Sequence, residues 1–318
     1  MKKLHFKKNN KLTFYIKSLV STAVPRALHI IRRNKSIKNI NAKQENYLHS
    51  RVDYYLKHKT AFSLSENAVQ IKDYKLKGNS AYFFDLQRVL NSFSLTLKFS
   101  YLFGDVITIE DTATIVKSRP IADNNENSVI MKLDSVRHFN FINDKLSFSE
   151  KSNTAVWRGK VHEKHQLHRV TMFNELYENK FCDIGKTNKT GSISKWEKNE
   201  LSIVEQLQHK FLLCVEGNDV ATNLKWAMSS NSLCMMCKPV YETWFMEGKL
   251  EAGVHYVELK DDYSNFNEKV EYYIAHPDQA QKIIDNAHQH VMQFKDEKQE
   301  LLISQLVLEK YFKLSGQC

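Results

Sequence analysis

The sequence is poor in the residues that break or cross-link a chain. Its 318 residues include only 9 Gly, 4 Pro and 5 Cys. So little Gly and Pro excludes collagen-like chains and proline-rich linkers. An odd number of scattered Cys argues against a disulfide framework. No apolar run reaches the roughly 18 to 20 residues that a membrane-spanning helix needs. The N-terminus also lacks the apolar core and cleavage site of a secretory signal, so we expect a cytoplasmic protein.

Acidic residues are missing from Lys2 to Lys43, although the chain carries 36 of them. The basic residues of this segment alternate with apolar and aromatic ones, and the whole chain has a formal net charge of +10. Such a segment suits an anionic surface, either a phospholipid leaflet or nucleic acid. A solvated basic tail that aids solubility is the alternative. We treat 1–43 as a basic N-terminal arm.

Hydrophobic residues make up 42% of the chain, as in folded globular proteins. Helical spacing of apolar residues predicts helices over 44–57, 84–92, 167–177, 277–291 and 297–314. Short apolar or β-branched runs predict strands over 106–109, 128–133, 155–157, 211–215, 233–236 and 254–259. In the second half these strands alternate with helix-length stretches, which is typical of a parallel sheet covered on both faces. A polar stretch near 140–152 suggests domains at 44–150 and 151–318.

The segment 211–226 is the most informative part of the sequence. An apolar run of strand length ends before Gly217, and a helix is predicted to begin near Asn223. The unpaired backbone N–H groups at a helix start attract anions, and phosphates above all. Lys225 falls in the first turn, where the helix dipole favours an acidic residue, so it suits a bound anion better than an empty end.

A second sequence that could bind an anion, Arg158-Gly159-Lys160, follows the strand predicted at 155–157. Arg offers a planar fork for phosphate oxygens, and Gly lets the backbone come close to a ligand. Ligands of open α/β sheets bind at the carboxyl ends of the strands, where this tripeptide and Gly217 would both lie.

Two carboxylates could carry chemistry. Asp111 follows the strand predicted at 106–109 and could take a proton from an attacking hydroxyl. The alternative is a turn residue that precedes Thr112. Glu242 follows the strand predicted at 233–236 and could accept hydrogen bonds from the vicinal hydroxyls of a sugar.

Several short motifs in one order resemble glycosyltransferase family 90. They are Trp157-Arg-Gly, the block from Asn218 to Met235, the segment 241–257 and Lys260-Asp-Asp-Tyr-Ser-Asn265, with Ile107-Thr-Ile-Glu-Asp111 and Lys117-Ser-Arg-Pro120 in the first half. That family includes protein O-glucosyltransferases, fungal capsule-associated proteins and bacterial lipopolysaccharide core glycosyltransferases. The chain resembles the bacterial lipopolysaccharide enzymes most.

The resemblance implies an α/β fold of the GT-B type, with two Rossmann-like domains facing a cleft and a C-terminal helix that packs back on the first domain. It also implies a UDP-sugar donor and inversion at the anomeric carbon. By position, Asp111 matches the general base, Arg158 and Gly159 match the Arg-Gly that meets the donor diphosphate, and Lys225 matches a lysine of the donor-site helix. Asn223 stands where the glucosyltransferase branch has an arginine. The expected donor-binding set is Arg158, Gly159, Lys160, Gly217, Asn218, Asn223, Lys225 and Glu242.

No Asp-x-Asp motif occurs in the chain, so the metal clamp of A-type glycosyltransferases is missing. We therefore expect no metal and no cofactor besides the UDP-sugar, with Arg158, Lys160, Lys225 and a helix N-terminus neutralising the departing diphosphate. The expected partners are a UDP-hexose (glucose or galactose), a lipid A-core oligosaccharide acceptor and the anionic inner face of the cytoplasmic membrane, without nucleic acid. Another surface polysaccharide or a protein acceptor is the alternative. A non-enzymatic basic protein that binds nucleic acid or an anionic surface is the alternative of another class.

Overall fold

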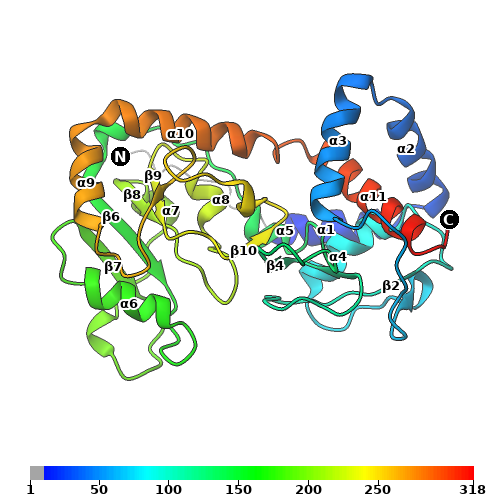
Figure 1. The fold of residues 1–318 in the computed structure, drawn as a ribbon, viewed down its shortest axis with the longest axis horizontal. Helices are drawn as coiled ribbons and strands as arrows, with labels where there is room; N and C mark the ends of the chain where they lie inside the picture. Colours follow the sequence, from blue (N-terminus) through cyan, green and yellow to red (C-terminus); the bar gives the residue numbers. More distant parts are fainter. Residues whose placement is uncertain (1–10) are drawn as a thin grey trace. The chain divides into compact units, whose positions relative to one another are not determined.

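The computed structural model describes residues 11–318, which divide into two compact units (Figure 1). We call the first the sheet unit; it comprises Phe139–Pro239 and Gly248–Gln293. The helical unit comprises 11–138, Val240–Glu247 and Phe294–Cys318. The sequence suggested a single domain boundary near 150, which would place the last two segments in the second domain. In the structure these segments belong to the helical unit. Residues 1–10 of the expected basic arm lie outside the described residues.

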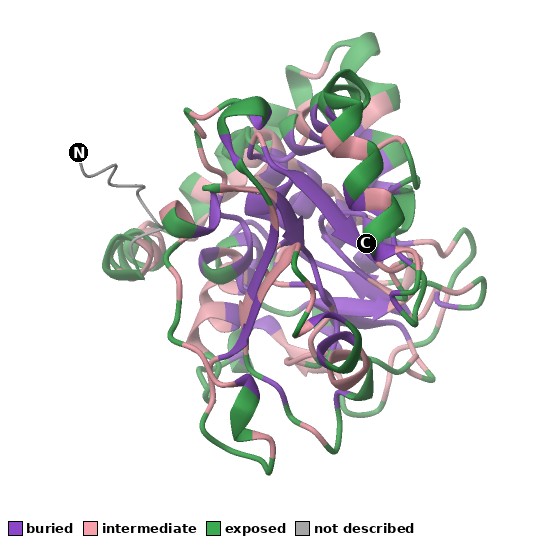
Figure 2. Ribbon diagram, turned by 90° about the vertical axis from the view of Figure 1, so that its left-hand side faces the viewer, coloured by how far each residue is buried: buried purple, intermediate pink, exposed green. Residues whose placement is uncertain are grey.

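Five parallel strands form the sheet of the sheet unit, in the order β11-β9-β8-β6-β7. They are β6 (Ser152–Gly159), β7 (Cys182–Lys186), β8 (His209–Leu213), β9 (Leu233–Met236) and β11 (Val257–Glu258). All four residues of β9 are buried, as expected where helices cover both faces of a parallel sheet. Figure 2 shows these buried strands in purple. The predicted α/β class and the parallel sheet of the second half are confirmed.

Helices precede, connect and follow the strands of the sheet unit. They are η2 (Phe148–Glu150), α6 (Leu167–Leu176), η3 (Ser194–Trp196), α7 (Ile203–Gln206), α8 (Leu224–Ala227), α9 (Phe266–Ala275) and α10 (Pro277–Met292). Phe173 of α6, Phe266 of α9 and Ile283 of α10 share one core cluster with Phe211 of β8. Pro277 begins α10 at a position where its missing N–H costs no helical hydrogen bond.

Helices dominate the helical unit. They are α1 (Lys11–Ala23), α2 (Arg26–Lys38), α3 (Ala42–Tyr55), η1 (Ile71–Asp73), α4 (Ser80–Leu90), α5 (Ser135–His138) and α11 (Glu297–Leu314). The C-terminal α11 packs against α2, α3 and α4. A buried ion pair of 3.0 Å between Arg51 and Glu300 joins α3 to α11, and Trp244 donates its indole N–H to the same carboxylate. Among residues 11–318, no helix combines the length and the apolarity needed to span a membrane.

The strands of the helical unit pair two by two and do not form the continuous sheet expected of a second Rossmann-like domain. The pairs are β1 (Val69–Gln70) with β2 (Lys98–Phe99), β3 (Thr114–Val116) with β5 (Ser128–Ile130), and β4 (Ser118–Pro120) with β10 (Tyr241–Thr243). A last short helix, η4 (Glu247–Lys249), follows β10. The strand predicted over 106–109 is wrong. The hydroxyl of Ser118 accepts from the Val106 N–H and donates to its carbonyl, so a side chain holds this backbone in place of a neighbouring strand.

Candidate functional site

The carboxyl ends of β6 and β8 carry most of the residues expected at the site. β6 ends at Gly159 and is followed by Lys160; β8 ends at Leu213 and leads to Gly217 and Asn218. The two strands are parallel neighbours, so these ends lie at the same edge of the sheet. The structure thus brings together, within one unit, the two sequences that were predicted to bind an anion.

Arg169 of α6 connects the two strand ends. Its guanidinium donates to the carbonyl oxygen of Lys160 after β6, and to those of Glu216 (2.8 Å) and Val215 (3.3 Å) after β8. The Trp157 ring lies beneath it, with 5.1 Å from the guanidinium carbon to the ring centroid. Three of the five N–H groups of the arginine are used in these bonds, which leaves two for a ligand.

The positive charge of Arg169 is not neutralised by a carboxylate of the described residues: its hydrogen bonds all go to carbonyl oxygens. Burial lowers the pKa of this guanidinium to about 10. A half-buried cation without a counter-charge is costly by itself, and an anionic ligand would compensate it.

A chain of side-chain hydrogen bonds holds Asn218 at the same edge. Its Oδ1 accepts from Gln166 Nε2 at 3.1 Å, and Gln166 Oε1 accepts from the backbone N–H of His162 at 3.0 Å. His168 bonds the carbonyl oxygen of Glu216 through Nε2. The loops after β6 and β8 are therefore tied to the start of α6.

Arg158 lies on the opposite face of β6 from Trp157, because side chains alternate along a strand. Its Nη2 donates to both carboxylate oxygens of Asp183 of β7, each at 2.9 Å, and its Nε donates to the carbonyl oxygen of Asn199. Burial opposes ionisation of Asp183, but hydrogen bonds from Lys198 and Arg158 outweigh it and lower its pKa. Arg158 thus has its own carboxylate partner in this structure.

Gly159 is required by the packing of Trp157. A Cβ atom at this position would lie 2.5 Å from the indole ring, because residues two apart share a face of the strand. The constraint at Gly217 is weaker: an added Cβ would lie 3.3 Å from Nη2 of Arg169, a tight contact with the end of a flexible side chain. Both glycines therefore admit the large side chains that build this edge.

The helix expected at Asn223 is a single turn, α8, and its start differs from the prediction. Asn223 makes no capping bond; its side-chain amide donates to the carbonyl oxygen of Leu213 at the end of β8. Lys225 is completely buried. Its charge acts on the buried Cys214 thiol, although burial of that thiol dominates and raises its pKa. So short a helix has a small dipole, so cationic side chains must provide most of the attraction for an anion.

Asp111 and Glu242 both belong to the helical unit. Asp111 is exposed, and its carbonyl oxygen accepts from the side-chain amide of Asn127 at 2.9 Å. Glu242 is buried in β10, where one carboxylate oxygen pairs with Arg119 at 2.7 Å and the other accepts from the Tyr54 hydroxyl. Burial, and then the charge of Glu242, raise the pKa of Tyr54. Glu242 therefore joins β4, β10 and α3.

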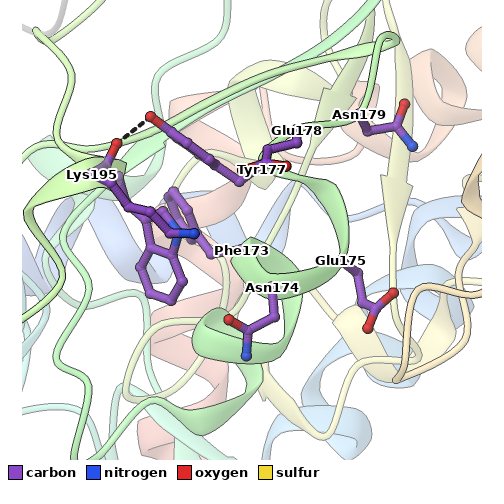
Figure 3. A pocket seen from close by; sticks show the side chains of 8 residues that line it. Phe173, Asn174, Glu175, Tyr177, Glu178, Asn179 and Lys195 are labelled. Atoms are coloured by element: carbon purple, nitrogen blue, oxygen red, sulfur yellow. Dashed lines mark hydrogen bonds between the residues drawn. The ribbon is translucent and has the colours of Figure 1, made fainter.

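A pocket lies beside α6, and none of its lining residues belongs to the predicted set (Figure 3). Its lining includes Phe173, Tyr177, Lys195 and Trp196. The Tyr177 hydroxyl donates to the carbonyl oxygen of Lys195 across it, as the dashed line in Figure 3 shows. The structure gives no reason to assign it a ligand. Within residues 11–318, no three His, Cys, Asp or Glu side chains are grouped so that they could hold a metal ion.

Sequence reasoning missed Arg169. Its signal was a basic residue among the apolar positions of the predicted helix at 167–177, adjacent to His168. Only the parallel pairing of β6 and β8 shows that this side chain reaches both strand ends.

Comparison with known proteins shows similarity to one protein family and to an enzyme of known type. A family model described as glycosyl transferase family 90 matches residues 129–315. The O-glucosyltransferase LpsA of Dichelobacter nodosus is 40% identical over 312 residues, which cover 96% of this chain and 96% of that protein. Arg158, Arg169 and Lys225 lie within the residues that the family model matches, whereas Asp111 precedes them.

Proposed function

Since this chain belongs to glycosyl transferase family 90 and is a glycosyltransferase, we propose that it transfers a hexose from a UDP-sugar to the lipopolysaccharide inner core, with inversion and without a metal ion. The hexose is glucose or galactose, and the name of the O-glucosyltransferase relative favours glucose. Membership of this enzyme family argues against the non-enzymatic binding protein that the basic charge alone allowed. The acceptor alternatives are another surface polysaccharide and a protein.

The observation that carries the proposal is the cationic edge of the sheet unit. Arg169 has two N–H groups to spare and no carboxylate partner among the described residues, and Lys160 is exposed beside it. We assign the donor diphosphate to this edge, with Gly217 and Asn218 at its rim and the sheet unit as the donor half of a B-type arrangement. The charge that develops on the diphosphate as it leaves is then stabilised by fixed cations.

In the proposed mechanism, the Asp111 carboxylate takes the proton from an acceptor hydroxyl. The hydroxyl oxygen forms a bond to the anomeric carbon while the bond from that carbon to the diphosphate oxygen breaks, and UDP leaves with the electron pair. Attack opposite to the leaving group inverts the anomeric centre. The exposed side chain of Asp111 is accessible to an acceptor. Arg158 is paired with Asp183, so it can bind the donor diphosphate only if the diphosphate displaces that carboxylate.

Asp111→Asn tests the assignment of the base. Transfer from UDP-glucose and UDP-galactose to purified lipid A-core acceptor should fall about 100-fold or more, because general base catalysis supplies factors of this order. Circular dichroism and thermal unfolding should match the wild-type protein, since the side chain is exposed. Near-normal turnover in the folded variant would remove Asp111 from the mechanism. Asp73→Asn, another exposed carboxylate of the helical unit, is the matched control and should leave turnover unchanged.

A further inference from the structure

The helix α1 (Lys11–Ala23) is fixed on the helical unit through one face. The Tyr15 hydroxyl lies 2.8 Å from the hydroxyl of Ser80 at the start of α4, and the rings of Tyr15 and Phe84 meet edge-on at 5.8 Å. No residue of α1 is fully buried, and Figure 2 draws this helix, which follows the grey trace, in green and pink. The helix is therefore a docked surface element.

The other face of α1 is apolar and open to solvent. Four aliphatic side chains expose large fractions of their surface: Leu12 66%, Ile16 52%, Leu19 59% and Val20 61%. Positions i, i+4, i+7 and i+8 fall on one side of a helix, so these side chains form a single stripe. We call them the α1 stripe. A surface helix of a water-soluble domain normally presents polar residues on this side. The stripe therefore needs an apolar environment that the described residues of the unit do not supply.

The charged residues of the segment that contains the stripe are all basic. Residues 11–43 contain no Asp or Glu, and their basic residues are Lys11, Lys17, Arg26, Arg32, Arg33, Lys35, Lys38 and Lys43. Arg26 and Arg33 of α2 point inward and donate to backbone carbonyl oxygens of Leu90, Phe93 and Ser92, which anchors α2 to the end of α4. The remaining six basic residues are exposed and can meet an anionic partner.

We propose that α1 lies in the surface of an anionic phospholipid bilayer, with the α1 stripe among the acyl chains and the neighbouring lysines at the headgroups. Interfacial helices combine an apolar face of this kind with Lys and Arg beside it, and each basic residue near an anionic leaflet adds attraction. This inference rests on the proposed function for its purpose, because a lipid-linked acceptor lies in such a surface.

Two other occupants fit the charges less well. Pairing of α1 with a second copy of the chain would place like charges opposite each other, with no carboxylate in 11–43 to compensate. Nucleic acid would satisfy the lysines but would leave the four aliphatic side chains in water, because phosphate contacts dominate its binding.

Sedimentation of the whole protein with vesicles tests the proposal. The protein should bind vesicles of phosphatidylcholine mixed with phosphatidylglycerol, and bind pure phosphatidylcholine much more weakly. The double variant I16S/L19S should weaken binding to the mixed vesicles by about tenfold or more, as expected for the loss of two inserted aliphatic side chains. The control L76S/L95S removes two leucines of the same unit that are 50% and 44% exposed, and should bind as the wild type does.

Equal binding by I16S/L19S and wild type would overturn the proposal, and so would equal binding to neutral and anionic vesicles. Concentration-dependent dimers that I16S/L19S abolishes in the absence of lipid would assign the stripe to a second copy instead. Thermal unfolding shows whether both double variants remain folded. Cleavage of UDP-hexose in the absence of vesicles separates the two proposals. I16S/L19S should retain this activity. A wild-type protein that binds vesicles but does not cleave UDP-hexose would contradict the proposed function and leave the membrane proposal intact.

Discussion

At the scale of single residues, Arg169 has the most consequential environment in the sheet unit. It binds the loops after β6 and β8 through carbonyl oxygens and stacks on Trp157, which in turn requires Gly159 beneath its ring. The same side chain therefore shapes the strand ends and leaves them positively charged. Arg158 differs, because Asp183 already neutralises it.

The variants Arg169→Met and Arg169→Lys separate charge from shape. Affinity for UDP, measured by calorimetry, should fall about tenfold or more in Arg169→Met, because a charge-assisted contact to phosphate is lost. Arg169→Lys keeps the charge but cannot reach three carbonyl oxygens at once, so it should recover part of the affinity and little of the turnover. The dependence of UDP affinity on salt should weaken in the Met variant and persist in the Lys variant.

Lys180→Met provides the control for Arg169, since it removes one exposed positive charge from the opposite end of β7. It should leave UDP affinity unchanged. An unchanged affinity in folded Arg169→Met would show instead that this arginine serves only the packing of the two loops.

The sequence was informative about single residues only where neighbours in the chain decide their environment. Arg158, Gly159 and Gly217 could be placed at strand ends from local patterns. The partner of Arg158 could not, because Asp183 is 25 positions away and comes close only through the pairing of β6 with β7. The burial of Lys225 could not be predicted from the sequence either. The helix expected around it has a single turn, and Lys225 is buried.

At the scale of elements, long periodic segments were predicted well and short ones were not. The helices predicted over 44–57 and 297–314 are present as α3 and α11. The β-branched residues at 106–109 do not form a strand, because Ser118 satisfies the backbone of Val106 and Asp105 pairs with Lys117 at 2.6 Å. Side chains from elsewhere in the unit decide such short segments, and local propensity does not show them.

The contact between α4 and α5 depends on a carboxylate in an unusual state. Asp85 of α4 accepts from the backbone N–H of Ser135 at 2.7 Å and from its hydroxyl at 2.8 Å, and so caps α5. Burial raises the pKa of Asp85 to about 7, against the opposing effect of these hydrogen bonds. The ionised form is therefore disfavoured in the folded protein relative to the unfolded chain.

Stability should consequently depend on pH through Asp85. Below about pH 4, Asp85 is protonated in both the folded and the unfolded protein and does not change the stability. Between about pH 4 and 7, Asp85 ionises in the unfolded chain but stays largely protonated in the folded protein. The free energy of unfolding therefore falls as pH rises through this range. Asp85→Asn removes this dependence. Relative to that variant, the wild type should lose roughly 4 kcal/mol of unfolding free energy over the interval, because each unit of a pKa raised to about 7 corresponds to about 1.4 kcal/mol. Urea denaturation at several pH values measures the difference.

The Asp73→Asn variant of the same unit, which removes an exposed carboxylate, is the control for the substitution itself. If the difference between Asp85→Asn and wild type does not change with pH, Asp85 is ionised without penalty and the assigned environment is wrong.

At the scale of the whole molecule, the sequence predicted the α/β class and the parallel sheet but not the path of the chain. Val240–Glu247 and Phe294–Cys318 return to the helical unit through pairs such as Tyr54 with Glu242, which are 188 positions apart. No local pattern encodes such a contact. The strand pairs of the helical unit were likewise hidden, because each strand has only two or three residues.

The proposed mechanism depends on cationic side chains of the sheet unit, which would take the role that a divalent ion has in other glycosyltransferases. The most direct test is hexose transfer from UDP-glucose and UDP-galactose by protein dialysed against EDTA and assayed in its presence. We predict that transfer proceeds at the rate seen before chelation, and that added Mg²⁺ or Mn²⁺ does not raise it. Loss of transfer in EDTA, with recovery when either ion is restored, would contradict the account.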